Sequence, residues 1–136
     1  MITAVDTSVL LDVFGANQRF GSASADALDK CALQGSLVAS EVVWAETAAA
    51  FRDESEFERA MRDLGVSFSP LTEAAAVRAA RQWRNYRSRG GRRERITSDF
   101  LIGAHALLCA ERLLTRDRGF YRSYFSGLQV IDPSAD

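Results

Sequence analysis

Four carboxylate side chains stand at positions from which they could act together. Asp6 and Asp117 each follow a short apolar run that is typical of a buried strand. Asp99 falls in the first turn of an expected helix, and Glu46 lies about two turns into another. Crowded carboxylates raise one another's pKa, so they stay ionised together only beside a cation. Because the ligands would be oxygen atoms, without cysteine or histidine, that cation would be Mg²⁺ or Mn²⁺ rather than Zn²⁺.

Short apolar runs alternate with helical segments along the chain, and this order decides where the four acids lie. Strands are expected at residues 2–5, 36–39, 66–68, 113–114 and 128–131. Helices are expected between them, and Thr7 or Ser8 should cap the first. Strands that alternate with helices favour an α/β fold with a mainly parallel sheet covered on both faces. Ligands of such sheets bind beyond the C-terminal ends of the strands, so we expect all four carboxylates at that edge.

The helix that carries Asp99 should be buried, because residues 100–110 are apolar almost all round. Thr97 or Ser98 is expected to cap it, and the helix dipole favours an acid in its first turn. His105, the only histidine, lies on this helix and is expected to be a buried, hydrogen-bonded side chain. A single histidine gives no support for a Ser-His-Asp arrangement.

Length and composition are those of an ordinary globular protein. The chain has 136 residues, of which 47% are hydrophobic and 26% charged, so one domain with a sizeable core is expected. No apolar run reaches membrane-spanning length, and the N-terminus does not resemble a signal peptide. Cys31 and Cys109 stand apart in helical stretches, which is typical of reduced core residues in a cytosolic protein.

The net charge of −1 hides a strong local asymmetry. Residues 78–95 contain eight arginines and one acid, Glu94, so this segment carries a charge of +7. The first part of the segment should be helical, with Ala76, Ala80 and Trp83 along its buried face. The segment leads directly into the helix of Asp99, so the cationic stretch and the acids are neighbours in sequence.

Four blocks of this sequence resemble the acidic blocks of PIN-domain nucleases. They are Val-Asp-Thr-Ser-Val-Leu at residues 5–10, the helix of Glu46, Thr-Ser-Asp-Phe-Leu-Ile-Gly-Ala at residues 97–104 and Leu-Thr-Arg-Asp at residues 114–117. The similarity is greatest to the short VapC type of toxin–antitoxin systems, and it spans the chain from Asp6 to the final strand. It implies a single PIN-like domain over residues 1–136, built as a three-layer α/β/α sandwich with a small, mainly parallel central sheet.

The same resemblance implies an endoribonuclease that depends on Mg²⁺ or Mn²⁺ and cleaves RNA with a metal-activated water. Carried over residue by residue, the catalytic acids of the family correspond to Asp6, Glu46, Asp99 and Asp117. Asp6 and Asp99 would bind the ion directly, whereas Asp117 and Glu46 would bind it directly or through water. Ser8 and Thr115 correspond to hydroxyl positions beside these acids.

The resemblance also implies partners. They are an RNA substrate, a cognate antitoxin whose cationic segment blocks the acidic site, and a second copy in a homodimer, all met in the cytoplasm without a membrane. Because a group of acids repels RNA, the neighbouring arginines are expected to guide the phosphate backbone through their forked donors. The arginines best placed for this are in and beside the expected loop: Arg87, Arg89, Arg92 and Arg93.

Other interpretations stay open from the sequence alone. Each acid by itself also fits a structural role, such as a helix cap for Asp6, and a catalytically silent module that binds RNA or protein is one alternative. A phosphotransfer enzyme built on Asp6 is another, but haloacid dehalogenase-like phosphatases need an aspartate where Ser8 stands. Receiver domains need a distal lysine, whereas Lys30, the only lysine, lies in an early helix. Glu41 is an alternative to Glu46 because its local context is similar.

Overall fold

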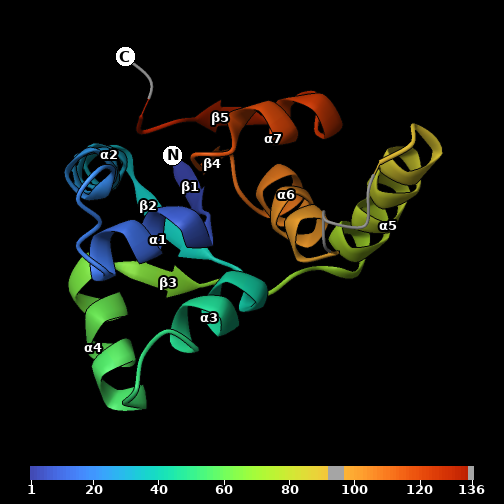
Figure 1. Cartoon of the computed structure of the whole chain (residues 1–136). Coiled ribbons are helices and arrows are strands. Elements are labelled where there is room, and N and C mark those ends of the chain that lie inside the picture. Colours follow the sequence, from blue (N-terminus) through green and yellow to red (C-terminus); the bar gives the residue numbers. More distant parts are fainter. Residues whose placement is uncertain (92–96, 135–136) are drawn as a thin grey trace.

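A five-stranded parallel sheet forms the centre of the protein (Figure 1). The computed structural model describes residues 1–91 and 97–134. In their order across the sheet, the strands are β3 (Val66–Phe68), β2 (Ser36–Ala39), β1 (Ile2–Val5), β4 (Arg112–Leu114) and β5 (Gln129–Ile131). Each pair of neighbours is parallel, so the C-terminal ends of all these strands lie at one edge. The expected strands are confirmed to within one residue at each end.

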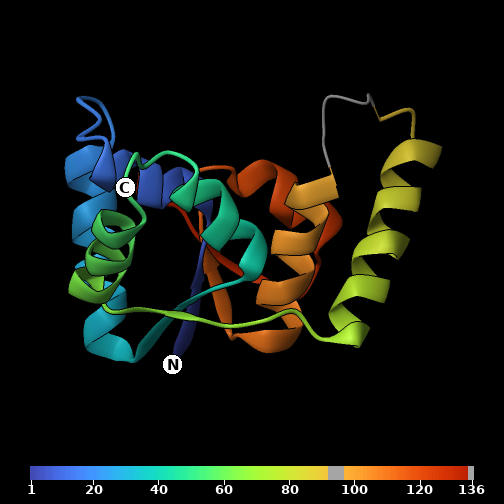
Figure 2. The same cartoon turned by 90° about the horizontal axis from the view of Figure 1, so that it is seen from below.

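Helices cover both faces of this sheet, as Figure 1 and Figure 2 show. They are α1 (Thr7–Phe14), α2 (Gly21–Gln34), α3 (Glu41–Ala48), α4 (Glu54–Leu64), α5 (Glu73–Ser88), α6 (Thr97–Cys109) and α7 (Arg118–Tyr124). In both views α1, α2 and α4 lie on one side of the sheet and α6 lies on the other, with α5 outside α6. The expected three-layer α/β/α sandwich is therefore confirmed.

Polar side chains begin several of the helices, as the sequence predicts. Ser40 precedes α3 and accepts a hydrogen bond from the backbone N–H of Val43 at 3.5 Å. Thr72 precedes α5 and accepts one from the N–H of Ala75 at 3.1 Å. Gly65 ends α4 in the left-handed conformation, with a φ of 76°, which a glycine adopts without strain. The cap at Ser40 begins the helix that carries Glu46 directly after β2, at the C-terminal edge of the sheet.

One predicted cap is wrong, and the other falls outside the described residues. Asp6, rather than Thr7 or Ser8, occupies the N-cap position of α1, and its side chain makes no capping hydrogen bond. The reason is that β1 passes into α1 without a connecting loop, so Thr7 is already helical. The helix of Asp99 begins at Thr97, so its N-cap falls outside the described residues and Ser98 lies within the helix. The carboxylate of Asp6 is therefore available for contacts other than capping.

The predicted buried face of α5 is wrong by one residue at its alanines, whereas Trp83 is half-buried and packs against the core as predicted. Ala75 and Ala79 are buried against α6, whereas Ala76 and Ala80 are exposed. Alanines occur at adjacent positions on this helix, so its small residues do not define a single face, and the packing against α6 decides which face is covered. As a result, Val77 is 59% exposed on the outer face of α5.

The helix α6 is buried along most of its length, as predicted, with Phe100 and Ala104 at 0% exposure. Gly103 allows the ring of Phe125 to approach, since a Cβ there would lie 2.4 Å from a ring carbon. His105 is buried, its Nε2 lies 3.0 Å from Ser69 Oγ, and burial lowers its pKa. The prediction of a buried, hydrogen-bonded histidine is therefore confirmed.

The state of the cysteines and the lengths of the helices agree with what the sequence predicts. Cys31 is buried, Cys109 is half-buried, and both are free thiols. None of the helices within residues 1–91 and 97–134 combines the length and the apolar character needed to cross a membrane.

Candidate functional site

Asp6 lies at the C-terminal edge of the sheet, where β1 and β4 end side by side. Its backbone N–H donates to the carbonyl oxygen of Leu114 at 2.9 Å, which extends the pairing of these two strands by one residue. The N–H of Thr115 donates in turn to the carbonyl oxygen of Ile131 at 3.0 Å, so the end of β4 is tied to the end of β5. The backbone that carries the site is therefore held by the sheet itself.

The carboxylate of Asp6 is buried and held by two hydroxyl groups. Its Oδ2 accepts a hydrogen bond from Thr115 Oγ1 at 2.6 Å and a longer one from Ser8 Oγ at 3.3 Å. Only 7% of Asp6 is exposed, and Thr115 is fully buried. Ser8 and Thr115, the two hydroxyl residues named from the sequence, therefore contact the same carboxylate.

Burial raises the pKa of Asp6 from its ordinary value of 3.8 to about 6. The hydrogen bond from Thr115 acts in the opposite direction, and the negative charge of Asp99 raises the pKa further. The charge of Asp99, in the first turn of α6, is therefore close enough to act on Asp6 although 93 positions separate them in the sequence. The chain thus places two carboxylates together, one of them in an environment that disfavours its charge.

Glu46 reaches the same region from α3. Its Oε1 accepts a hydrogen bond from Thr7 Oγ1 at 2.7 Å, and Thr7 is the residue next to Asp6. Glu41, the alternative from the sequence, lies elsewhere, because its carboxylate accepts from the backbone N–H of Leu71 at 2.9 and 3.1 Å. Thr7 is a site residue that the sequence reasoning missed, since it considered only helix capping at that position.

Asp117 is joined to Asp6 through a shared hydroxyl. The backbone N–H of Asp117 donates to Thr115 Oγ1 at 3.0 Å, while the same Oγ1 donates to Asp6. Asp117 is half-buried and precedes α7, a short helix that the strand and helix pattern did not predict. The structure thus brings all four predicted acids to one edge of the sheet. Asp117 is linked to Asp6 through Thr115, and Glu46 accepts a hydrogen bond from Thr7, the residue next to Asp6.

A PIN domain family model matches residues 3–126, which is most of the chain. The chain belongs to the PIN domain family. Solved structures of similar fold come from toxin–antitoxin complexes, and identities this low support a shared fold. A chain of VapBC-1 from nontypeable Haemophilus influenzae is 21% identical, with a TM-score of 0.75 and coverage of 99% of this chain and 100% of that one.

Two further complexes contain chains of the same fold. One is VapBC2 from Rickettsia felis bound to a DNA fragment from its promoter, with 16% identity, a TM-score of 0.74 and coverage of 97% of this chain and 98% of that one. The other is a toxin–antitoxin complex from Klebsiella pneumoniae, with 20% identity, a TM-score of 0.70 and coverage of 98% and 99%. No functionally curated protein showed significant sequence similarity.

The acids of this PIN domain are suited to a hard divalent cation. Within residues 1–91 and 97–134, no group of three or more His, Cys, Asp or Glu side chains lies close enough to surround an ion. What the structure brings together is the Asp6–Asp99 pair, with Glu46 and Asp117 nearby. Mg²⁺ usually keeps several waters and is held by one or two carboxylates, so such a pair fits it better than a closed protein cage would.

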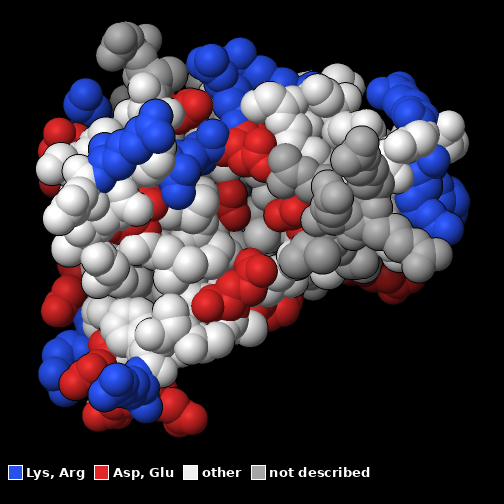
Figure 3. All heavy atoms as spheres, viewed as in Figure 1, with Lys and Arg blue, Asp and Glu red and all other residues white. Residues whose placement is uncertain are grey.

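Acidic and basic side chains occupy different parts of the surface. Figure 3 shows acidic side chains grouped near the middle of the face that Figure 1 presents, and basic side chains mostly towards its periphery. Of the predicted RNA-binding arginines, Arg87 and Arg89 are exposed at the C-terminal end of α5, whereas Arg92 and Arg93 lie outside the described residues. The Arg89 guanidinium carbon lies 5.8 Å from the ring centroid of Tyr124 on α7. This contact directs a cationic group from α5 towards the helix that follows Asp117.

Proposed function

We propose that this PIN domain, a single domain over residues 1–136, is an endoribonuclease that depends on Mg²⁺ or Mn²⁺ and serves as the toxin of a toxin–antitoxin pair. The observation that carries the proposal is the buried carboxylate of Asp6, whose pKa is raised by burial and by the charge of Asp99. A protein keeps such a pair at a loss of stability unless a cation offsets its charge. PIN domains are typically metal-dependent nucleases, which agrees with this donor set.

In the proposed mechanism each residue has a defined task. Asp6 and Asp99 would hold the divalent ion, and Asp117 and Glu46 would contact it directly or through water. A bound ion of this kind lowers the pKa of water and offsets charge on the phosphoryl oxygens. Thr115 and Ser8 donate to Asp6 Oδ2 and so fix the orientation of that carboxylate. Thr7 does the same for Glu46.

The direct test is cleavage of mixed cellular RNA by the purified chain with Mg²⁺, with Mn²⁺ or with EDTA. We expect fragments with either ion and none with EDTA, and no fragments from an Asp6→Ala preparation purified in parallel. Expression of the wild type should arrest the growth of a bacterial host, and Asp6→Ala should not. If neither ion supports cleavage by folded protein, the chain is a silent binding module instead. The phosphotransfer alternative would need an aspartate beside Asp6 at position 8. The residue there is Ser8, whose hydroxyl contacts Asp6, so this alternative gains no support.

An antitoxin is the second proposed partner. The similar folds occur in complexes named as VapBC and toxin–antitoxin assemblies. A cationic segment of a small antitoxin would offset the charges of Asp6 and Asp99 as a metal ion does, and would thereby exclude the ion. RNA and such a partner would both be met in the cytoplasm.

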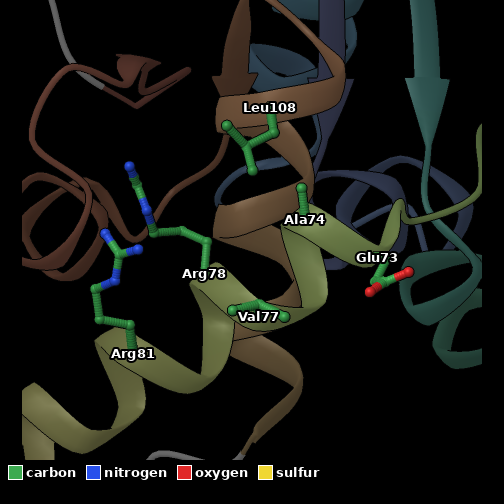
Figure 4. A pocket seen from close by; sticks show the side chains of 6 residues that line it. All are labelled: Glu73, Ala74, Val77, Arg78, Arg81 and Leu108. Atoms are coloured by element: carbon green, nitrogen blue, oxygen red, sulfur yellow. The ribbon is translucent and has the colours of Figure 1, made fainter.

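A homodimer is the third proposed assembly, and the outer face of α5 suits it. Figure 4 shows a pocket beside this face, which is lined by Leu108 of α6 and by five residues of α5: Glu73, Ala74, Val77, Arg78 and Arg81. Val77 is 59% exposed and Leu108 is 45% exposed, so an apolar patch lies between an acid and two arginines. Glu73, Val77 and Arg81 are four residues apart and share one side of the helix. Around a two-fold axis at Val77, Glu73 of each copy would face Arg81 of the other.

Replacing Val77 by aspartate should convert the dimer into a monomer, because two carboxylates would meet at the axis. Glu73→Arg should also weaken the dimer, and adding Arg81→Glu to it should restore the dimer, since the exchanged charges again face each other. Light scattering coupled to gel filtration measures the mass. Leu33→Asp is the control, since Leu33 is 89% exposed on α2 and far from α5 in the fold. A wild-type chain that stays monomeric at all concentrations contradicts the proposal.

The arginine-rich segment is proposed to follow the RNA backbone. Replacing Arg89, Arg92 and Arg93 by alanine should flatten the plot of log binding constant against log salt concentration by about 2, at about 0.7 per phosphate contact for a single strand. Fluorescence anisotropy with labelled RNA measures this slope. A matched control replaces three exposed arginines on the opposite side of the fold: Arg52, Arg59 and Arg62. Equal slopes for both triple variants would show that the segment does not contact RNA.

A further inference from the structure

Arg116 stands between two residues of the proposed site, Thr115 and Asp117, but its side chain turns to a different partner. Its Nε donates to Asp12 Oδ2 at 2.6 Å and its Nη2 donates to Asp12 Oδ1 at 3.0 Å. This is the two-pronged arrangement in which a guanidinium binds a carboxylate most strongly. Asp12 lies on α1 and is only 3% exposed. The pair therefore joins the loop after β4 to the first helix.

The pair is enclosed by residues from the start of α2. Ser24 Oγ donates to Asp12 Oδ2 at 2.9 Å, so this carboxylate accepts bonds from three donors. The Arg116 guanidinium carbon lies 4.1 Å from the ring centroid of Phe20, which covers the cation. A carboxylate buried to this degree is costly without its partner, so the fold holds Arg116 in place. The position of the backbone at residue 116 is fixed as a consequence.

Two hydrogen bonds of the site depend on that backbone position. Thr115 Oγ1 donates to Asp6 Oδ2 at 2.6 Å and accepts from the N–H of Asp117 at 3.0 Å. Both residues are bonded directly to Arg116 in the chain, so any displacement of residue 116 moves both contacts. Lysine could keep the charge at this position, but it has no planar fork with which to engage both oxygens of Asp12.

We propose that Arg116, held by Asp12, is a positioning residue of the metal site, which sets the loop so that Thr115 and Asp117 face Asp6. This inference rests on the proposed function, because it assumes that Asp6 and its neighbours bind a divalent ion. The contacts of the pair are with other protein groups, Ser24 and Phe20. The pair contributes by fixing the geometry of the loop, because Arg116 is bonded directly to the two residues that it positions, Thr115 and Asp117.

The test compares Arg116→Lys with Arg112→Lys by measuring Mn²⁺ affinity, with titration calorimetry or electron paramagnetic resonance. Arg112 is the matched control, because it lies at the start of β4, the strand that precedes Arg116, and is 5% exposed. Its guanidinium donates to Thr3 Oγ1 at 2.8 Å and to Gln34. Both variants lose a guanidinium that donates two hydrogen bonds, to one carboxylate for Arg116 and to two different side chains for Arg112. Arg116→Lys should weaken Mn²⁺ binding about tenfold, at the low end of the 10–100-fold range for residues that orient metal ligands. Arg112→Lys should change it by less than about twofold.

A metal-free measurement accompanies the titration. In EDTA, hydrogen exchange at the Asp117 amide should be faster in Arg116→Lys than in wild type and unchanged in Arg112→Lys, since only the first variant releases the Thr115–Asp117 contact. Asp12→Asn should reproduce both effects of Arg116→Lys in a milder form, which keeps the test usable if Arg116→Lys does not fold. Combining Asp12→Asn with Arg116→Lys should add little, because both remove one interaction.

The outcomes separate the two proposals. Wild-type Mn²⁺ affinity and exchange in Arg116→Lys and Asp12→Asn would overturn the positioning role alone, and so would an equal loss of affinity in Arg112→Lys. A wild-type chain that binds no Mn²⁺ would overturn the proposed metal-dependent function together with this inference.

Discussion

Replacing Asp99 by asparagine should lower the rate of metal-dependent RNA cleavage by at least about 100-fold while leaving the fold intact. The substitution keeps the size of the side chain and removes the charge that would face the ion together with Asp6. Changes in residues that only orient metal ligands already cost about 10–100-fold, so loss of a direct ligand should reach at least the upper end of that range. The measurement is the rate constant for RNA cleavage at saturating Mg²⁺ and Mn²⁺, with circular dichroism to monitor the fold.

The fold should survive because the change is small at this position. An acid in the first turn of a helix contributes about 0.3–1 kcal/mol through the helix dipole, which limits the loss of stability from this source. Removing the charge of Asp99 should also lower the pKa of Asp6, because that charge is one of the causes that raise it. Glu54→Gln is a matched control, since Glu54 is a first-turn acid on α4 and is exposed. Wild-type cleavage rates in folded Asp99→Asn would contradict the metal-site proposal.

The sequence was sufficient to locate the acids because their positions follow from chain topology. Asp6 and Asp117 come after strands, Asp99 lies in the first turn of a helix and Glu46 lies within one, and parallel strands bring these points to one edge. Periodicity and capping signals are local and show where each strand and helix ends. In a parallel sheet all the C-terminal strand ends share one edge, so residues that follow different strands lie close together. The same reasoning favoured Glu46 but left Glu41 as an alternative, because their difference lies in contacts with Thr7 and with Leu71 from other parts of the chain.

The predicted face of α5 failed because it depends on such a tertiary contact. The alanines of α5 offer two small faces, and only packing against α6 shows that Ala75 rather than Ala76 is buried. No partner was predicted for Arg116, which binds Asp12, 104 residues away. No pattern within one segment indicates a partner at that separation. Contacts of this kind position the site, whereas the acids themselves could be recognised from the sequence.

Replacing Asp6 by asparagine should make the metal-free protein more stable above neutral pH. The pKa of Asp6 in the folded protein is about 6, which is higher than its ordinary value of 3.8. Between these two values the folded chain binds more protons than the unfolded chain, so stability falls as the pH rises through this interval. At about 1.4 kcal/mol per pH unit, the charged carboxylate costs about 3 kcal/mol once the pH exceeds 6. Asparagine carries no charge and avoids this cost.

Urea denaturation in EDTA measures the difference. At pH 8 Asp6→Asn should exceed the wild type by about 1–3 kcal/mol in the free energy of unfolding, with the lower values reflecting a weaker hydrogen bond from Thr115. Well below pH 3.8 the advantage should disappear, because the wild-type carboxyl is then protonated in both the folded and the unfolded chain. Asp29→Asn, which replaces an exposed acid on α2, is the control substitution.

Adding Mn²⁺ should reverse the order of stability at pH 8. Binding to the folded wild type stabilises it by about 2.7 kcal/mol when the ion is at 100 times its dissociation constant, and Asp6→Asn, lacking a ligand, should gain little. The instability of the metal-free site and its affinity for the ion would then have one origin in the uncompensated charge of Asp6. If Asp6→Asn is less stable than the wild type at pH 8 in EDTA, a cationic group of the chain already offsets that charge, and the argument for a metal ion at Asp6 loses its physical basis.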